Sequence, residues 1–251
     1  MDTWVLLRGL TRESRHWGSF AGQFQQAFPA ATVLVLDLPG NGLLNGQRSP
    51  SLVGAMVEHC RAQLRQQQIA PPFKVLAMSL GAMVSVAWSQ TYPQEVAVQV
   101  LINTSMRPLN AFYQRLQPRH YATLLRLLLS GAAPDAWERF ILQITSNQAD
   151  ASVLPLWLSL RLQHPVTVAN ALRQLLAAAR FQADLAVPEA ATLLLASARD
   201  QLVSPACSIA WAKQWQCPIR THPRAGHDLP LDDAHWVIAQ VLDWLAAQPP
   251  R

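Results

Sequence analysis

Much of the chain alternates between short apolar runs and longer segments with apolar residues at helical spacing. The short runs, rich in aliphatic and β-branched residues, predict buried strands, and the longer segments predict helices. The strands are expected at residues 4–7, 32–36, 73–78, 96–102, 190–196 and 218–221. Strand and helix in alternation are typical of parallel strands joined by right-handed crossovers. We therefore predict an α/β fold with a mostly parallel sheet of about six strands flanked by helices.

The alternation stops for a long stretch after the fourth predicted strand. Between residues 107 and 184 the pattern predicts helices only, at 121–129, 136–144, 154–162 and 166–181. Elsewhere, helices are expected at 16–28, from Leu80 to Trp88, and at 234–247. A further helix is expected to run to about Gln68, with Ser51 as its cap. We therefore predict one α/β core made of residues 1–106 and 185–251, with a helical insertion at 107–184.

Ser79 lies where the apolar run 73–78 meets the helical segment that begins at Leu80. A serine on a sharp strand-to-helix turn exposes its hydroxyl above the sheet edge, close to the unpaired N–H groups of the helix. Residues 77–81 read Ala-Met-Ser-Leu-Gly and match the nucleophile pattern G-x-S-x-G except at Ala77. The alternative is a serine that only caps the helix.

Two later loops place candidate partners of Ser79 at the ends of predicted strands. Asp200 follows the strand at 190–196, and His227 follows the last strand. The carboxyl ends of parallel strands share one edge of a sheet, so the three side chains should converge there. A serine needs a base such as histidine, and a carboxylate orients the imidazole and stabilises its charged form. Taken singly, Asp200 could cap a helix and His227 could be a loop residue without function.

Other carboxylates compete with Asp200 for the orienting role. The competing carboxylates are Asp184, Asp228, Asp232 and Asp233. Asp228 directly follows His227, and a sequence neighbour usually points elsewhere. Asp232 and Asp233 are expected to cap the final helix.

These motifs together resemble the α/β-hydrolase fold superfamily over nearly the whole chain. The segments that carry the resemblance are 8–10 (Arg-Gly-Leu), 37–42 (Asp-Leu-Pro-Gly-Asn-Gly), 78–81, 199–203 (Arg-Asp-Gln-Leu-Val) and 225–228 (Ala-Gly-His-Asp). In size and shape the chain resembles the small capped carboxylesterases and the biotin-pathway carrier-protein methyl esterases.

The resemblance implies a serine hydrolase with a catalytic triad of Ser79, Asp200 and His227. It also implies an oxyanion hole made by the backbone N–H groups of Leu10 and Leu80. The chain departs from the family at Arg8, where many relatives have histidine before the glycine. We expect Arg8 either to change the charge of the site or to be solvated. The antiparallel hairpin that often opens the family sheet is expected to be absent.

The helical insertion resembles the cap that covers the serine in this family. Substrate-pocket candidates are Phe112, Tyr113 and Trp157 in the cap, together with Arg8 in the core. The cap is also basic, since eight arginines stand against three acidic residues: Arg107, Arg115, Arg119, Arg126, Arg139, Arg161, Arg173 and Arg180 against Asp135, Glu138 and Asp150. The arginines either form solvated helix faces or steer an acidic carrier or a carboxylate-bearing substrate.

Composition narrows the class of protein. Charged residues are only 14% and the net charge is +5, without a run of Lys and Arg, so nucleic acid is not an expected partner. The three cysteines, Cys60, Cys207 and Cys217, show no disulfide or zinc spacing. We find no membrane span and no signal peptide, which favours a cytoplasmic protein. No motif predicts a cofactor or a metal.

The sequence leaves several functions open. The first is a serine ester hydrolase that forms an acyl-enzyme with a small-molecule ester. The second is a methyl esterase or thioesterase for an acyl chain on an acidic carrier protein. The third is a lyase that uses the same triad on a carboxylate substrate, and the fourth is a non-catalytic ligand-binding protein.

Overall fold

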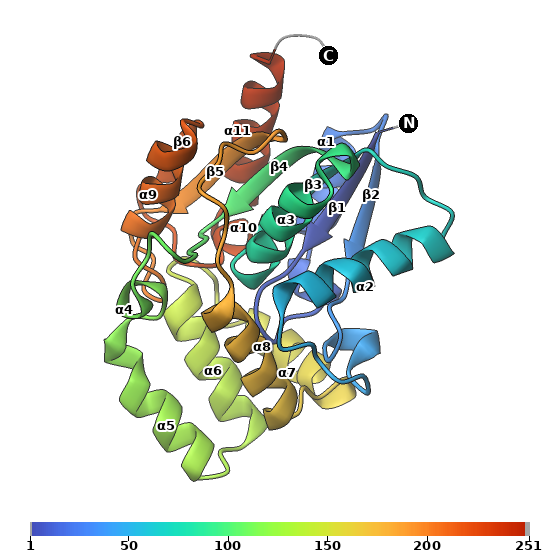
Figure 1. Cartoon of the computed structure of the whole chain (residues 1–251). Helices are drawn as coiled ribbons and strands as arrows, with labels where there is room; N and C mark the ends of the chain where they lie inside the picture. Colours follow the sequence, from blue (N-terminus) through green and yellow to red (C-terminus); the bar gives the residue numbers. More distant parts are fainter. Residues whose placement is uncertain (1, 249–251) are drawn as a thin grey trace.

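A six-stranded sheet forms the centre of the molecule (Figure 1), whose computed structural model describes residues 2–248. The strands are β1 (Thr3–Leu7), β2 (Thr32–Leu36), β3 (Phe73–Met78), β4 (Val96–Ile102), β5 (Ala191–Ser197) and β6 (Ile219–His222). They lie in the order β2-β1-β3-β4-β5-β6, and every neighbouring pair is parallel. The predicted α/β fold class is confirmed. Within residues 2–248, the sheet has no antiparallel strand.

Alternate side chains of each strand enter two separate cores. In β1, Val5 and Leu7 pack into a core shared with α2 (Val53–Gln66), α3 (Leu80–Thr91) and α9 (Ala206–Trp215). Trp4 and Leu6 pack into the other core, which α1 (Phe20–Ala27) and α11 (Ala234–Ala246) cover. Because both faces are covered, the inner strands β1, β3, β4 and β5 are mostly apolar, as expected for a buried parallel sheet. The edge strand β6 differs, since it reads Ile-Arg-Thr-His.

The core helices predicted from the sequence are present with two differences, and α9 is a core helix that was not predicted. The segment predicted as one helix at 16–28 is divided into the 3-10 helix η1 (Ser14–Trp17) and α1, because Gly18 between them has φ of 53°. Helix α2 starts after Leu52, so the prediction that Ser51 caps it is wrong. The remaining core helices are the short η2 (Gly42–Leu44), η3 (Pro93–Glu95) and α10 (Leu229–Asp232).

The long helical stretch between β4 and β5 forms its own group of helices, which we call the inserted helices. They are α4 (Phe112–Arg115), η4 (Pro118–His120), α5 (Tyr121–Leu129), α6 (Pro134–Thr145), α7 (Val153–Gln163) and α8 (Val168–Arg180). In Figure 1 they lie beyond the carboxyl ends of the strands, on the side away from α11 and the two chain ends. The four longer ones agree with the predicted positions, and α4 and η4 are too short to give a periodic pattern.

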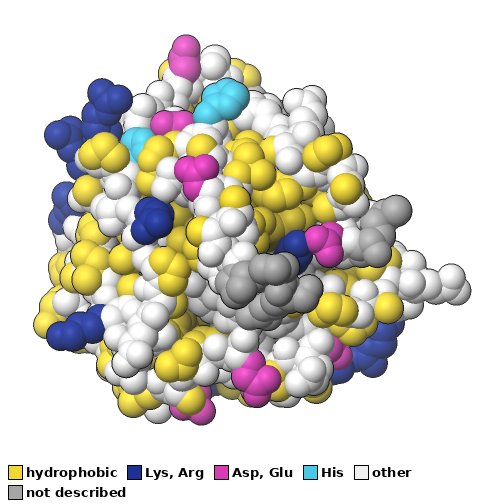
Figure 2. All heavy atoms as spheres, turned by 90° about the horizontal axis from the view of Figure 1, so that it is seen from above, with side chains coloured by type: hydrophobic (Ala, Val, Ile, Leu, Met, Phe, Trp, Pro, Cys, Tyr) yellow, Lys and Arg dark blue, Asp and Glu magenta, His cyan; other side chains and the backbone are white. Residues whose placement is uncertain are grey.

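The surface remote from the inserted helices has mixed character. Figure 2 views the molecule from the opposite end and shows charged side chains of both signs scattered among hydrophobic ones.

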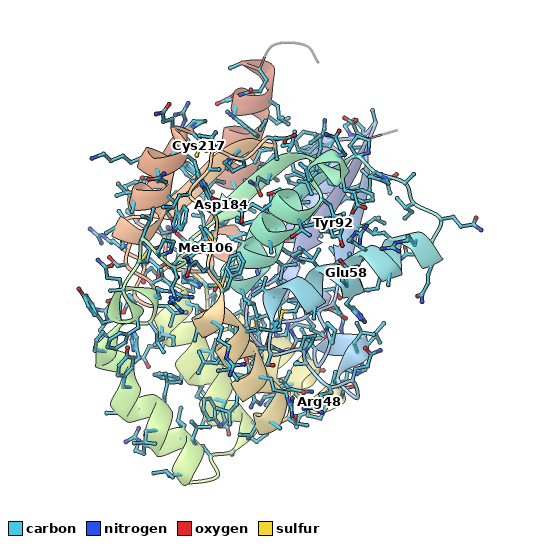
Figure 3. The ribbon with its side chains drawn as sticks, viewed as in Figure 1. Arg48, Glu58, Tyr92, Met106, Asp184 and Cys217 are labelled. Carbon is cyan, nitrogen blue, oxygen red and sulfur yellow. The ribbon has the colours of Figure 1, made fainter. Side chains whose placement is uncertain are left out.

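Where α2 meets the end of α3, the Tyr92 hydroxyl donates to Glu58 at 2.7 Å, and both residues are labelled in Figure 3. Among the described helices, none has the length and apolarity needed to cross a membrane.

Candidate active site

Ser79 occupies a sharp turn between β3 and α3. Its φ of 54° and ψ of −119° are unusual for a residue with a side chain and cost on the order of 1–3 kcal/mol. The turn is tight because α3 begins against the backbone of β1: a Cβ at Gly81 would lie 2.5 Å from the carbonyl oxygen of Leu7. Ala77, which replaces the first glycine of the pattern, belongs to β3, and its methyl group packs in the core shared with α2 and α3. The local sequence therefore presents the Ser79 hydroxyl at the carboxyl edge of the sheet.

The loop after β1 runs directly beside this turn. A Cβ at Gly9 would lie 3.1 Å from the Cβ of Ser79 and 3.6 Å from its hydroxyl oxygen. Leu10 follows Gly9 in this loop, and Leu80 is the first residue of α3, where backbone N–H groups lack helical partners. Within residues 2–248, no backbone acceptor takes the N–H of Leu10 or of Leu80. Both amides are therefore free to donate to an oxygen atom outside the chain.

Asp200 and His227 form a buried pair at the ends of β5 and β6. His227 Nδ1 lies 2.7 Å from Asp200 Oδ2, and the two side chains are 4% and 1% exposed. The other carboxylate oxygen of Asp200 accepts the backbone N–H groups of Leu202 and Val203 at 2.8 and 2.9 Å. Asp200 therefore fixes the ring of His227 and also closes its own loop. It does not cap a helix, because the N-cap of the following helix α9 is Pro205.

The remaining ring nitrogen of His227 is available. Nε2 is buried and has no hydrogen-bond partner among the described residues. The structure likewise gives the hydroxyl of Ser79, which is partly exposed, no hydrogen bond within residues 2–248. Thus His227 and Asp200 are joined, whereas Ser79 and His227 are not. In the absence of substrate, bonds between a nucleophile and its base are often long and tighten on binding.

Asn103, at the end of β4, holds the loops of the site together and was missed from the sequence. Its side-chain amide donates to the backbone oxygen of His227 at 2.8 Å and to Ser197 Oγ at 3.0 Å, and its oxygen accepts the N–H of Ser197 at 2.8 Å. Asn103 itself has φ of 46°. The available signal was its position, since it directly follows a strand that ends at the same edge as β3 and β5.

Arg8 is buried against Asp228, the residue after His227. Nη1 and Nη2 lie 3.0 and 2.5 Å from the two carboxylate oxygens, and the side chains are 3% and 4% exposed. The Arg8 guanidinium also lies 4.8 Å from the Trp17 ring centre. Two expectations are therefore wrong: Arg8 is not solvated, and its charge is balanced by Asp228. The pair joins the loop after β1 to the loop that carries His227. Asp228 is thereby occupied, and Asp200 is the carboxylate on the ring.

A second buried ionic group links the loop after β1 to the inserted helices. Arg12 Nη1 lies 2.7 Å from Glu138 on α6, and Arg161 on α7 lies 3.0 Å from the other oxygen of Glu138. The Arg12 guanidinium also lies 4.1 Å from the ring centre of Trp157.

His16 in η1 lies beside this ionic group, with Nε2 2.9 Å from Arg12 Nη1. Burial, with the charges of Arg12 and Arg8, lowers the pKa of His16 well below 6.5, so this ring is neutral at pH 7.

The predicted pocket residues are not brought together. Phe112 and Tyr113 on the single turn α4 are 73% and 53% exposed. Trp157 is 2% exposed and packs on Arg12, while Arg8 is bound to Asp228. An apolar pocket shared by these four residues is therefore not formed in this structure.

The loop of His227 is anchored to the end of α6. The N–H of Asp228 donates to Thr145 O at 2.6 Å. Asp232 accepts the N–H of Gly226 at 2.6 Å and that of Asn147 at 3.0 Å. The predicted role of Asp232 as a helix cap is therefore wrong, whereas the side chain of Asp233 does cap α11, with an N–H bond from Trp236.

Cysteine is a poor alternative nucleophile in this chain. Burial raises the pKa of Cys60 and of Cys207 to about 12, and that of Cys217 to about 11. The thiols are therefore protonated at neutral pH and weakly nucleophilic. Within the described part of the chain, no group of three or more His, Cys, Asp or Glu is arranged to hold a metal ion.

Comparisons with known proteins agree with the fold. Residues 4–240 match the family model described as alpha/beta hydrolase family. No curated protein matches the sequence. A thermophilic esterase from Thermogutta terrifontis is 18% identical, with 98% of this chain and 90% of that one covered and a TM-score of 0.73.

Two further solved structures have the same architecture. A 2-hydroxy-6-oxo-6-phenylhexa-2,4-dienoate hydrolase from a Rhodococcus strain is 16% identical, with 98% and 91% coverage of the two chains and a TM-score of 0.77. A hydrolase from Pseudomonas aeruginosa is 20% identical, with 98% and 90% coverage and a TM-score of 0.76. At these identities, the structural likeness concerns the fold alone.

Proposed function

Because the chain belongs to the alpha/beta hydrolase family, we propose that it is a serine hydrolase that cleaves a carboxylic ester through an acyl-enzyme intermediate. Ser79 is the nucleophile, His227 is the general base and acid, and Asp200 orients the ring. The observation that carries the proposal is the buried bond of 2.7 Å between His227 and Asp200, at the same sheet edge as the strained turn of Ser79.

In the acylation step, Nε2 of His227 takes the hydroxyl proton of Ser79 as its oxygen attacks the ester carbonyl carbon. The carbonyl oxygen becomes an oxyanion and accepts hydrogen bonds from the backbone N–H groups of Leu10 and Leu80. Loss of one such donor costs about 100- to 1000-fold in rate. The tetrahedral intermediate then expels the alcohol, which takes the proton from His227. In the second step, His227 takes a proton from a water molecule, whose oxygen attacks the carbonyl carbon of the acyl-enzyme. The acid then leaves, and Ser79 takes the proton back from His227.

Asp200 acts on the base and does not touch the substrate. Its bond to Nδ1 keeps the proton on that nitrogen, leaves Nε2 as the acceptor, and stabilises the imidazolium that forms. Two backbone N–H groups on its other oxygen hold the carboxylate in place. Asp200→Asn is expected to lower kcat by about four orders of magnitude, as loss of the corresponding carboxylate does in other triads.

The inserted helices are assigned the role of a cap over Ser79. Support comes from their place beyond the carboxyl ends of the strands (Figure 1) and from the ionic bond between Arg12 and Glu138. A panel of esters, thioesters and carboxylate substrates tests the specific reaction. It separates simple ester cleavage from carrier-bound ester or thioester cleavage and from lyase chemistry by the same residues.

The direct test is covalent labelling with a fluorophosphonate probe, read by mass spectrometry of the labelled peptide. The wild-type protein should be labelled on Ser79 and hydrolyse p-nitrophenyl esters. Ser79→Ala should lose both properties, while Ser19→Ala, which changes an exposed serine before α1, should keep both. Labelling and turnover that persist in Ser79→Ala would refute the assignment.

A further inference from the structure

A hollow of about 790 Å³ lies next to the site just described, where the inserted helices meet the loops after β5 and β6, and shares Asp200 with it. Its lining includes three arginines and three side-chain amides: Arg119, Arg199, Arg224, Asn147, Gln148 and Gln201. Arg119 comes from η4 and the amides at 147 and 148 follow α6, whereas the others belong to the two core loops. A ligand held there would touch the inserted helices and the core at once.

The positive charge of this hollow is not balanced by the protein. Asp200 is the one acidic residue on the wall, and its two oxygens are taken by His227 and by the N–H groups of its own loop. The side chains of Arg199 and Arg224 are exposed and have no acidic partner within residues 2–248. Arg119 donates to the carbonyl oxygen of Gln201 at 2.9 Å and also lacks an acidic partner in that part of the chain.

The backbone from which the arginines project is fixed. The side-chain nitrogen Nδ2 of Asn147 donates to the backbone carbonyl oxygens of Arg199 and Arg224 at 2.9 and 3.2 Å. Gln201 donates in turn to the side-chain oxygen of Asn147 at 2.7 Å. The loops of Arg199 and Arg224 are therefore held together before any ligand arrives. Only the side chains need to be ordered on binding, which lowers its entropic cost.

Because three guanidinium groups without an acidic partner among the described residues line one hollow, we propose that it binds the phosphate group of a small molecule. Guanidinium forks match phosphate oxygens in a bidentate manner, and three of them can balance a phosphate or diphosphate that carries two or three charges. A single carboxylate would balance only one of the three. The volume lies in the range of small-molecule sites, so there is room for an organic group beside the phosphate.

The proposal is tested by isothermal titration calorimetry of the whole chain with inorganic pyrophosphate, phosphate and acetate at low ionic strength. Pyrophosphate should bind most tightly and acetate most weakly. Arg199→Gln and Arg224→Gln should each weaken pyrophosphate binding about tenfold or more, since each removes a charge-assisted pair. Arg224→Lys, which keeps the charge without the fork, should weaken it less than Arg224→Gln.

The matched control is Arg48→Gln, because Arg48 is exposed and lies in the loop before α2, away from α4 (Figures 1 and 3). It should leave pyrophosphate binding unchanged. The proposal is wrong if pyrophosphate does not bind, if Arg48→Gln weakens it as much as the hollow variants do, or if acetate binds equally well. Ser79→Ala should bind pyrophosphate like the wild-type protein, so this result stands apart from the outcome of the hydrolase test.

Discussion

The ion pair between Arg8 and Asp228 should give one of the largest stability losses available from a single substitution in this chain. The Arg8 side chain is only 3% exposed and lies on the Trp17 ring. In Asp228→Asn, its guanidinium therefore stays buried without a carboxylate to balance its charge. Removing one partner of such a pair costs about 3–5 kcal/mol. The total stability of a domain is on the order of 5–15 kcal/mol, so a substantial share of it would be lost.

The assay is urea unfolding followed by tryptophan fluorescence, for which the chain offers nine tryptophans. The free energy of unfolding is obtained by linear extrapolation for the wild-type protein, Asp228→Asn, Arg8→Met and the double variant. Each single variant leaves one buried charge, but the double variant leaves none. The double variant should therefore lose much less than the sum of the two single losses.

The matched control is the ion pair between Arg139 and Asp135 on α6. Its atoms are 3.7 Å apart and its side chains are 69% and 51% exposed, so Asp135→Asn should cost less than about 1 kcal/mol. Losses below about 1 kcal/mol in both Arg8→Met and Asp228→Asn, or strictly additive losses in the double variant, would refute the reasoning.

Three further outcomes are expected. Gly81→Ala should destabilise the chain, because its Cβ would lie 2.5 Å from a carbonyl oxygen of β1. Gly22→Ala, at an exposed position of α1 with nothing within 4 Å, should instead stabilise the chain by about 0.5–1 kcal/mol in thermal unfolding. Asn103→Ala should reduce esterase kcat about 100-fold through displacement of the His227 loop, and an unchanged kcat would contradict this role. Burial lowers the pKa of His16, so the unfolded chain takes up a proton below about pH 6.5 while the folded chain does not. Stability should therefore fall as pH decreases below that value, and His16→Gln should flatten this slope in urea unfolding.

Local patterns were sufficient for the sheet and for the turn of Ser79. The strand at 73–78 could be predicted from its run of apolar residues, because the strand is buried on both faces. The turn could be predicted from the small residues beside Ser79, because α3 passes close to β1 there. The meeting of Asp200 with His227 followed from topology, because parallel strands end at one edge.

Partners far apart in sequence could not be predicted in this way. Arg8 and Asp228 are 220 residues apart, and no local pattern indicates that their loops meet. The bonds of Asn103 to the His227 loop likewise depend on the completed sheet. Phe112 was placed in a pocket on its chemistry alone, but α4 is a single turn that leaves it exposed to solvent.

The bonds between the end of α6 and the loop of His227 bear on the design of chimaeras. The carbonyl oxygen of Thr145 and the N–H of Asn147 are bound to Asp228 and Asp232 of the core. A transplant that exchanged every residue between β4 and β5 would replace the segment whose backbone supports the histidine loop. The crossover point for exchanging substrate specificity therefore lies before residue 142, so that the last turn of α6 stays with the recipient core.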